Sequence, residues 1–378
     1  MAVMLCHLLV LTANAGEAEP EAMHEAVVEG AENTLARDED LSRHVFSSSQ
    51  RKYMKWVGDK PAETHPEPAY RFLMEIHQEL AAGVRDRPGV LSPFMVGKTV
   101  QGRPIWGFRI RRPSVEVHHR VLVFAGIHAL EWVPAEVAAS FILEMVYQPP
   151  VGVEVVVVPV LNVDGRRSVQ QDLRAGENRY RRANANGVDL NRDFAVHRDS
   201  TAVWRHLLPG YYKTSPSVLS QPETQAIDRL AAEGFDVVVS LHAFGGFIYY
   251  PWAGRFSRPP GWRTYVELGN IMASGQSGNA YRVRELSRWG FFFRALGTDL
   301  DHMHGEHGAY SFLIELTRSG LHPLGRGTWK NNFRMYNPVD PSRHTNAGVD
   351  ALRALVGALS WRGGEPLPQK DPNWSGGE

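Results

Sequence analysis

The sequence contains almost no cysteine. Its one cysteine, Cys6, lies in an apolar segment at the start of the chain, so the remainder cannot form an internal disulfide. The scarcity also excludes a cysteine nucleophile and a cysteine-rich zinc site. Any metal ion must therefore be held by histidine, aspartate or glutamate, and the chain has 16 histidines.

The chain also lacks an excess of either charge. Its 41 Lys and Arg residues balance its 41 Asp and Glu residues, so no basic excess points to nucleic acid as a partner. Beyond the first residues, no apolar run is long enough to span a membrane. With 378 residues, 43% of them hydrophobic, the chain is expected to be globular with a substantial buried core.

The two ends of the chain differ in composition from its middle. Residues 1–15 hold an apolar core followed by Ala13-Asn14-Ala15, which predicts a signal peptide and a secreted or periplasmic protein. Because no Lys or Arg precedes the apolar core, a misplaced start or a buried segment is the alternative. Residues 16–66 are polar and predict a leader or a short propeptide, and residues 363–378 predict a disordered tail. Residues 67–362 are expected to form one folded domain.

Four apolar, β-branched runs in this domain are typical of strands that are buried on both faces. They are Val121–Ile127, Val153–Leu161, Val237–Leu241 and Phe312–Ile314. Helical patterns separate several of them, and one such helix has Ser220-x-x-Glu223 as a start signal and Gly234 as a stop signal. This alternation predicts an α/β fold with a mixed, mostly parallel twisted sheet and helices on both faces.

Polar residues of catalytic type follow all four runs. They are His128, the Asn162-Val-Asp164-Gly165 turn, His242 and Glu315. In parallel sheets, active sites gather beyond the carboxyl ends of the strands. A single histidine after a strand is more often a packed side chain than a ligand, and a His-x-x-Glu spacing such as His128 to Glu131 arises by chance. The convergence nevertheless favours a zinc site of two histidines and one glutamate, with a fourth position open for water.

Five motifs, in chain order, resemble those of the zinc metallocarboxypeptidase family of the carboxypeptidase A and B type. They are GIHALEW, NVDG, VDLNRDF, VVSLHAFGGFIYYPW and YSFLIELT, and the resemblance covers about Pro68 to Trp361. It implies a single catalytic domain that binds one Zn²⁺ and removes the C-terminal residue from peptides or proteins. A monomer without nucleic-acid partner or membrane span is expected.

The resemblance implies a catalytic role for specific residues. His128, Glu131 and His242 match the zinc ligands, and two neutral imidazoles with one carboxylate leave the metal positive enough to polarise a carbonyl. Glu315 matches the general base, which takes a proton from the attacking water and passes it to the leaving amine. Arg182 matches the arginine that stabilises the oxyanion.

Other residues match the positions that bind the substrate. Asn191 and Arg192 resemble the pair that grips the terminal carboxylate, for which a planar guanidinium is well suited. An alignment slip of one residue would favour Arg181 over Arg182 as the oxyanion-stabilising group. Leu130 stands where many members of the family have arginine, so extended substrates are expected to be held differently.

The substrate pocket departs from the family pattern at one position and leaves a choice at another. Phe293 occupies the place of the tyrosine that covers the substrate, so an apolar lid remains without its phenol. Leu300 is expected at the floor of the pocket for the terminal side chain, which favours apolar or aromatic residues. Asp299 and Asp301 flank it, and a shift of one residue would favour Lys or Arg instead.

A histidine-rich tract precedes the last strand. It consists of His302, His304, Glu306 and His307, and such tracts bind metals adventitiously. Because these residues match no family ligand, the sequence favours a loop role over a second metal site.

Two other functions compete with peptide hydrolysis. One is a related amidase that trims peptidoglycan peptides with the same zinc centre. The other is an inactive peptide-binding module, which Phe293 would suit but which the retained acids, histidines and arginines disfavour.

Overall fold

The structure is a computed structural model that describes residues 46–58, 65–199, 206, 213–278, 280–289, 294–317 and 331–368. The predicted signal peptide at 1–15, most of the predicted leader, and Phe293 lie outside these residues. The chain from Ser49 onward forms one compact unit. Within the described residues, no helix combines the length and apolar character needed to cross a membrane.

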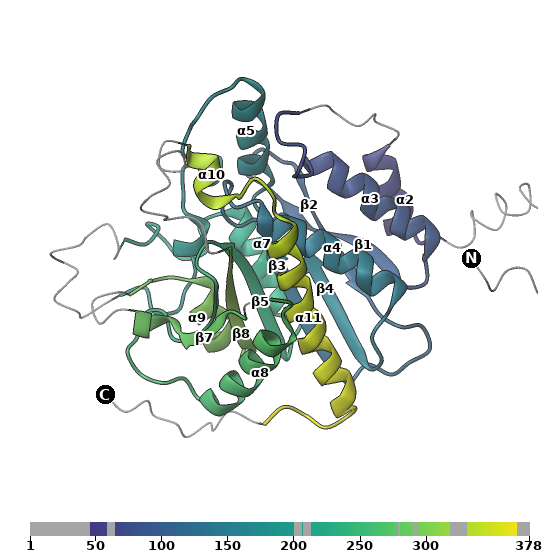
Figure 1. Ribbon diagram of the computed structural model, residues 1–378, viewed down its shortest axis with the longest axis vertical. Coiled ribbons are helices and arrows are strands. Elements are labelled where there is room, and N and C mark those ends of the chain that lie inside the picture. Colours follow the sequence, from purple (N-terminus) through teal and green to yellow (C-terminus); the bar gives the residue numbers. More distant parts are fainter. Residues whose placement is uncertain are drawn as a thin grey trace, which may run out of the picture. The chain divides into compact units, whose positions relative to one another are not determined.

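An eight-stranded mixed sheet forms the centre of this unit (Figure 1). Its order is β1 (Leu91–Lys98), β2 (Pro104–Ile110), β4 (Val153–Val158), β3 (His119–Ala125), β5 (Val237–Ala243), β8 (Tyr310–Leu316), β6 (Phe247–Tyr250) and β7 (Arg282–Glu285). Strands β4, β3, β5 and β8 run parallel at the centre, and antiparallel pairs join β1 to β2, β2 to β4 and β6 to β8. The predicted α/β fold with a mixed sheet is therefore confirmed.

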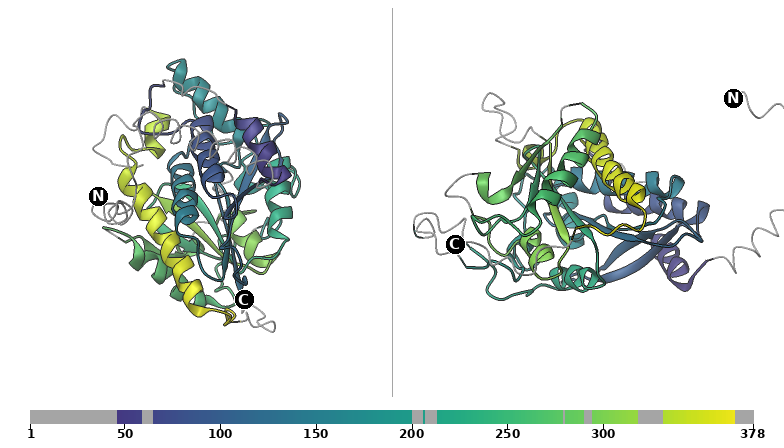
Figure 2. Two further views of the ribbon diagram at one scale, coloured as in Figure 1. Left: turned by 90° about the vertical axis from the view of Figure 1, so that its right-hand side faces the viewer. Right: turned by 90° about the horizontal axis from the view of Figure 1, so that it is seen from below.

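Helices cover both faces of the sheet (Figures 1 and 2). On one face lie α4 (Val133–Tyr147), α8 (Trp262–Gly275) and α11 (Ser342–Arg362), and on the other lie α7 (Pro222–Ala231) and α9 (Asp299–Gly305). The remaining elements are α2 (Ser48–Val57), α3 (Leu73–Asp86), α5 (Val163–Arg174), α10 (Asn332–Tyr336) and the 3₁₀ turns η1 (Leu190–Arg192) and η2 (Leu286–Trp289). All of the side chains of β4 and β5 are buried, as expected for strands covered on both sides.

Helix α2 lies inside the segment predicted as a polar leader, residues 16–66. Its Tyr53 is fully buried, donates a hydrogen bond to the carbonyl of His77 on α3 at 2.9 Å and packs edge-on against Phe108 of β2. The folded unit therefore begins at Ser49, ahead of the predicted start at residue 67.

The chain end also differs from the prediction. Residues 363–368 were expected to be disordered, yet Leu367 is buried and the carbonyl of Pro368 accepts a hydrogen bond from the Tyr310 hydroxyl at 2.7 Å. The first six residues of the predicted tail therefore pack against the folded unit.

Candidate metal centre and active site

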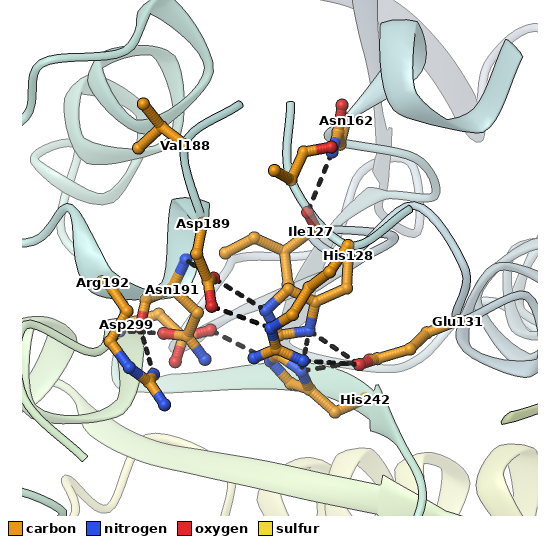
Figure 3. Close-up of polar contacts among 12 residues, drawn as sticks. Ile127, His128, Glu131, Asn162, Val188, Asp189, Asn191, Arg192, His242 and Asp299 are labelled. Atoms are coloured by element: carbon orange, nitrogen blue, oxygen red, sulfur yellow. Dashed lines mark hydrogen bonds and ion pairs between the residues drawn. The ribbon is translucent and has the colours of Figure 1, made fainter. Parts of the chain in front are cut away.

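His128, Glu131 and His242 form one buried cluster at the carboxyl edge of the sheet (Figure 3). His128 follows β3, Glu131 precedes α4, and His242 lies in β5. Strands β3 and β5 are parallel neighbours in which Ala125 pairs with Leu241, so both histidines reach the same edge. Residue 126 is glycine, with φ +65°, and a Cβ there would lie 3.2 Å from the Cα of Val160.

The cluster has the geometry of a metal site. Glu131 Oε1 lies 2.7 Å from His128 Nδ1, Glu131 Oε2 lies 3.3 Å from His242 Nδ1, and the two Nδ1 atoms are 3.2 Å apart. Three donor atoms of two imidazoles and one carboxylate therefore converge, which is the donor set that zinc prefers when a coordination position stays open for water.

The electrostatics of the cluster favour a cation at its centre. Burial disfavours the ionised form of Glu131, but the adjoining His128 and His242 hold its pKa below the usual range. Burial likewise disfavours a charged His242, yet its contacts with Asp299 and Glu131 raise its pKa to about 10. The carboxylates of Asp299 and Glu131 therefore stabilise positive charge at the imidazole of His242. A metal ion bound at the two Nδ1 atoms would satisfy the same negative potential.

The outer nitrogen of each histidine has an acidic group within reach. His128 Nε2 lies 3.2 Å from Asp189 Oδ1, and His242 Nε2 lies 2.9 Å from Ser240 Oγ and 3.4 Å from Asp299 Oδ2. The Ser240 hydroxyl in turn donates to the buried carboxylate of Asp299. With a metal ion at the Nδ1 atoms, each Nε2 would carry the proton and donate it to these neighbours, which would hold the ring in the tautomer that metal binding needs.

Glu315 lies beside the cluster on the neighbouring strand. It is the direct partner of His242 in the β5–β8 pairing, and Gly245 leaves room for it, because a Cβ there would lie 3.1 Å from the Glu315 Cβ. The side chain is partly buried, and its Oε2 atom is buried without a hydrogen-bond partner among the described residues. Burial, reinforced by the charge of Glu131, raises the pKa of Glu315 to about 8, against the opposing effect of His242.

Of the two candidate arginines, it is Arg182 that reaches the cluster. Its Nε donates to Asp189 Oδ2 at 2.8 Å, and its Nη1 lies 3.4 Å from Glu131 Oε1. Arg181 instead pairs with Asp172 on α5, with Nη2 2.9 Å from Oδ1. The one-residue shift that would favour Arg181 is thus inconsistent with this geometry.

Asn191 and Arg192 lie in the short turn η1, where Asn191 contacts both Asp189 and Asp299. The Asn191 backbone N–H donates to Asp189 Oδ1 at 3.0 Å, and its side-chain Oδ1 accepts from the backbone N–H of Asp299 at 2.8 Å. Arg192 borders a pocket of ≈ 630 Å³. The other lining residues include Tyr180, Arg182, Asp189 and Lys213. Among the described residues Arg192 forms no ion pair, so its guanidinium is available to an anion in this pocket.

Leu300 lies in a buried apolar cluster with Tyr249, Ala253, Leu286, Ala295 and Leu313. Its two acidic neighbours are engaged elsewhere. Asp299 binds Ser240, and Asp301 accepts hydrogen bonds from the backbone N–H groups of Ala253 and Gly254. The carboxylates on either side of Leu300 therefore have partners of their own.

Comparison with known proteins supports the same reading. The model of the zinc carboxypeptidase family matches residues 76–333, well over half of the chain. The chain belongs to the zinc carboxypeptidase family. Mast cell carboxypeptidase A of Mus musculus is 24% identical over 309 residues, which cover 75% of this chain and 66% of that protein. Carboxypeptidase A6 of Mus musculus is 24% identical over 268 residues, covering 66% of this chain and 61% of the relative. The chain thus spans just under two thirds of the length of these relatives.

Solved structures show the same fold. Thrombin activatable fibrinolysis inhibitor superposes with a TM-score of 0.62 at 17% identity, covering 82% of this chain and 80% of the other. Carboxypeptidase A from Helicoverpa armigera gives a TM-score of 0.60 at 20% identity, covering 86% of this chain and 80% of the other. At these identities the likeness establishes the zinc carboxypeptidase fold.

Three supporting residues of this family member did not emerge from the sequence. Asp189 lies two residues before Asn191 in VDLNRDF, and Ser240 lies two residues before His242, on the same face of the strand. Both spacings were available as signals. In the sequence Asp299 stands out only as a neighbour of Leu300, because its contact with Ser240 joins positions 59 residues apart.

Asp299 provides a test of how the candidate metal ligand His242 is held. We expect Asp299→Asn to weaken zinc binding by about 10–100-fold, because the Ser240 hydroxyl loses its charged acceptor and no longer fixes the His242 ring. Zinc affinity is measured by competition with a coloured chelator.

Asp301→Asn is the matched control, since Asp301 is equally buried on α9 but binds backbone N–H groups and His197. It is expected to lower thermal stability and to leave zinc affinity unchanged. Equal losses of zinc affinity in both variants would show that Asp299 acts only through the stability of α9.

Proposed function

We propose that this protein is a zinc-dependent metallocarboxypeptidase that hydrolyses the C-terminal peptide bond of peptides or proteins. The observation that carries the proposal is one arrangement at the sheet edge. A candidate metal-binding cluster, a partly buried glutamate and an arginine without an ion-pair partner among the described residues lie together there. Each supplies one requirement of terminal peptide hydrolysis.

The residues of the chain divide the reaction among them. His128, Glu131 and His242 would hold a zinc ion, which would supply Lewis-acid chemistry to the scissile carbonyl and to the attacking water. Glu315 takes a proton from that water and delivers it to the leaving amine, a task suited to a carboxyl group whose pKa is raised. Arg182 offsets the negative charge that develops on the carbonyl oxygen.

Recognition of the chain end rests on Arg192 and Asn191. A guanidinium binds a carboxylate through two parallel hydrogen bonds, so Arg192 would set the distance from the terminal carboxylate to the scissile bond. An internal peptide bond brings no carboxylate to this position. The arrangement therefore supports cleavage at the chain end.

The proposed preference is for apolar or aromatic terminal residues. Leu300 belongs to an apolar cluster, and the acids on either side of it bind other groups, so no free carboxylate is supplied there for a terminal Lys or Arg. The proposal includes export from the cell, for which the predicted signal segment at residues 1–15 is the support.

Release of terminal amino acids from blocked dipeptides tests this function. The panel ends in Phe, Leu, Lys or Arg and includes a peptidoglycan peptide, and the zinc content of the protein is measured in parallel. We expect Phe and Leu to be released about 10–200-fold faster than Lys and Arg, with activity lost to a chelator and restored by Zn²⁺.

Each other outcome identifies a different function. A preference for Lys or Arg would refute the proposed preference for apolar terminal residues, and cleavage of the peptidoglycan peptide alone would identify the amidase. Absence of both zinc and turnover would leave the inactive peptide-binding module.

A further inference from the structure

A second group of metal-ligating side chains lies on the face of the sheet covered by α7 and α9. Asp228 is on α7, His302 is on α9, and His307 lies in the turn between α9 and β8. Asp228 Oδ1 is 2.8 Å from His302 Nε2 and 2.8 Å from His307 Nε2. We propose that these three residues bind a second divalent metal ion of the zinc class, independent of the proposed peptidase activity.

The donor set is that of the first cluster, with two imidazole nitrogens and one carboxylate oxygen. The spacing is also alike, because His128 Nδ1 and Glu131 Oε1 are 2.7 Å apart in the first cluster. Zinc bonds of about 2.0–2.1 Å in a tetrahedral site require the donors to separate by roughly half an ångström. Movement of this size is available to His307, which lies in a turn.

The protonation states suit a metal ion. Burial alone would raise the pKa of Asp228, but hydrogen bonds with His302 and His307 lower it, so the carboxylate is ionised. Burial lowers the pKa of His302, which favours a neutral imidazole, and the proton that its Nε2 donates to Asp228 would move to Nδ1 when a metal ion binds at Nε2. The charge of the Asp228 Oδ1 atom is therefore balanced either by N–H groups of the two imidazoles or by a bound cation.

The surroundings predict a weaker site than the first one. His302 is fully buried against the ring of Phe194, whereas Asp228 and His307 are partly exposed, so an ion can enter and water can complete its coordination. His302 Nδ1 has no hydrogen-bond partner among the described residues. Loss of such a partner weakens metal binding by about 10–100-fold, so a chelator should remove this ion before the one at His128 and His242.

A metal ion bound by these three residues would stabilise the segment of chain that leads to the candidate active site. The ion would join α7 to the turn that leads into β8, the strand that carries Glu315. The same α9 carries Asp299, which binds the Ser240 hydroxyl. Zn²⁺ should accordingly raise the thermal midpoint, by roughly 2–4 °C at about ten times its dissociation constant.

The test is the number of zinc ions per chain in the full-length protein after equilibration with micromolar Zn²⁺ and gel filtration. His307→Ala is expected to hold one ion fewer than the wild type, and Asp228→Asn, which keeps the side-chain shape, is expected to match it. His118→Ala is the control, because His118 is an exposed histidine in neither cluster, and it should retain the wild-type count.

The difference in zinc ions per chain between the wild type and the variants tests the second site, whatever the zinc occupancy of the first cluster. A wild-type count equal to those of His307→Ala and Asp228→Asn would overturn the proposal and leave Asp228 as a hydrogen-bond acceptor for two histidines. A lower count in His118→Ala as well would equally overturn it, since the extra ion would then be bound nonspecifically by surface histidines.

Discussion

Glu315→Gln is expected to lower kcat by about 10²–10⁴-fold while the protein still binds zinc. Glutamine keeps the size of the side chain but accepts no proton, so the attacking water is no longer deprotonated. Glu315 is not among the three clustered donors, and zinc content should therefore stay at the wild-type value. The measurements are steady-state hydrolysis of a blocked dipeptide and metal analysis of the same sample.

The same substitution is expected to stabilise the metal-free protein above neutral pH. In the folded chain the pKa of Glu315 is raised to about 8, against an ordinary value of 4.5. The unfolded chain thus releases this proton at lower pH, and wild-type stability falls as pH rises from about 4.5 to about 8. Glutamine removes this loss, a change on the order of 1–3 kcal/mol in the free energy of unfolding.

Thermal midpoints of both metal-free proteins at about pH 5 and about pH 9 test this prediction. The wild type should lose more stability over this interval than Glu315→Gln. Glu223→Gln serves as the activity control, because the buried Glu223 binds Asn184 and the Val100 backbone N–H and should leave turnover intact. Turnover retained in Glu315→Gln would remove it from the role of general base.

The sequence predicts the fold and the first metal cluster because both depend on local pattern. Strands apolar on both faces identify the parallel centre of the sheet, and His128 and His242 follow or end neighbouring strands. Their meeting point is then a consequence of parallel topology. No contact between distant side chains has to be known in advance.

Sequence patterns do not predict a contact whose two residues lie far apart in the chain. A composition averaged over a long segment also hides a short amphipathic helix. Asp228 is 74 residues from His302, so the histidine tract shows half of a cluster and suggests a loop. Helix α2 has a polar composition, yet Tyr53 and Val57 lie one turn apart and both are buried, a pattern hidden in the average over residues 16–66.

The N-terminus of helix α7 is a third position where the sequence pattern predicts a different contact from the one in the structure. Ser220-x-x-Glu223 reads as a capping box, but the Ser220 hydroxyl donates to Asp193 and Gln221 occupies the N-cap. The tertiary contact replaces the local one, because Asp193 offers a charged acceptor. The helix still begins at Pro222, whose fixed φ suits a first turn.

Arg192→Ala is expected to remove most of the proposed preference for a free chain end. Losing a buried charge-assisted contact costs about 2–5 kcal/mol, which lowers kcat/KM for peptides with a free terminal carboxylate by roughly 30–5,000-fold. The same peptides with an amidated C-terminus should be poor substrates for both the wild type and the variant, because neither can pair with the neutral amide. The measured quantity is the ratio of kcat/KM for the free and the amidated peptide.

Arg181→Ala is the matched control for this ratio. Its guanidinium pairs with Asp172 on α5, away from the pocket that Arg192 borders, so the ratio should stay at the wild-type value. Added guanidinium ions should partly restore kcat/KM in Arg192→Ala for the free carboxylate and leave the amidated peptide unaffected, because they refill only the missing charge. If Arg192→Ala kept the wild-type ratio, the terminal carboxylate would have to be held by another cation of the pocket, and Arg182 and Lys213 are the two that line it.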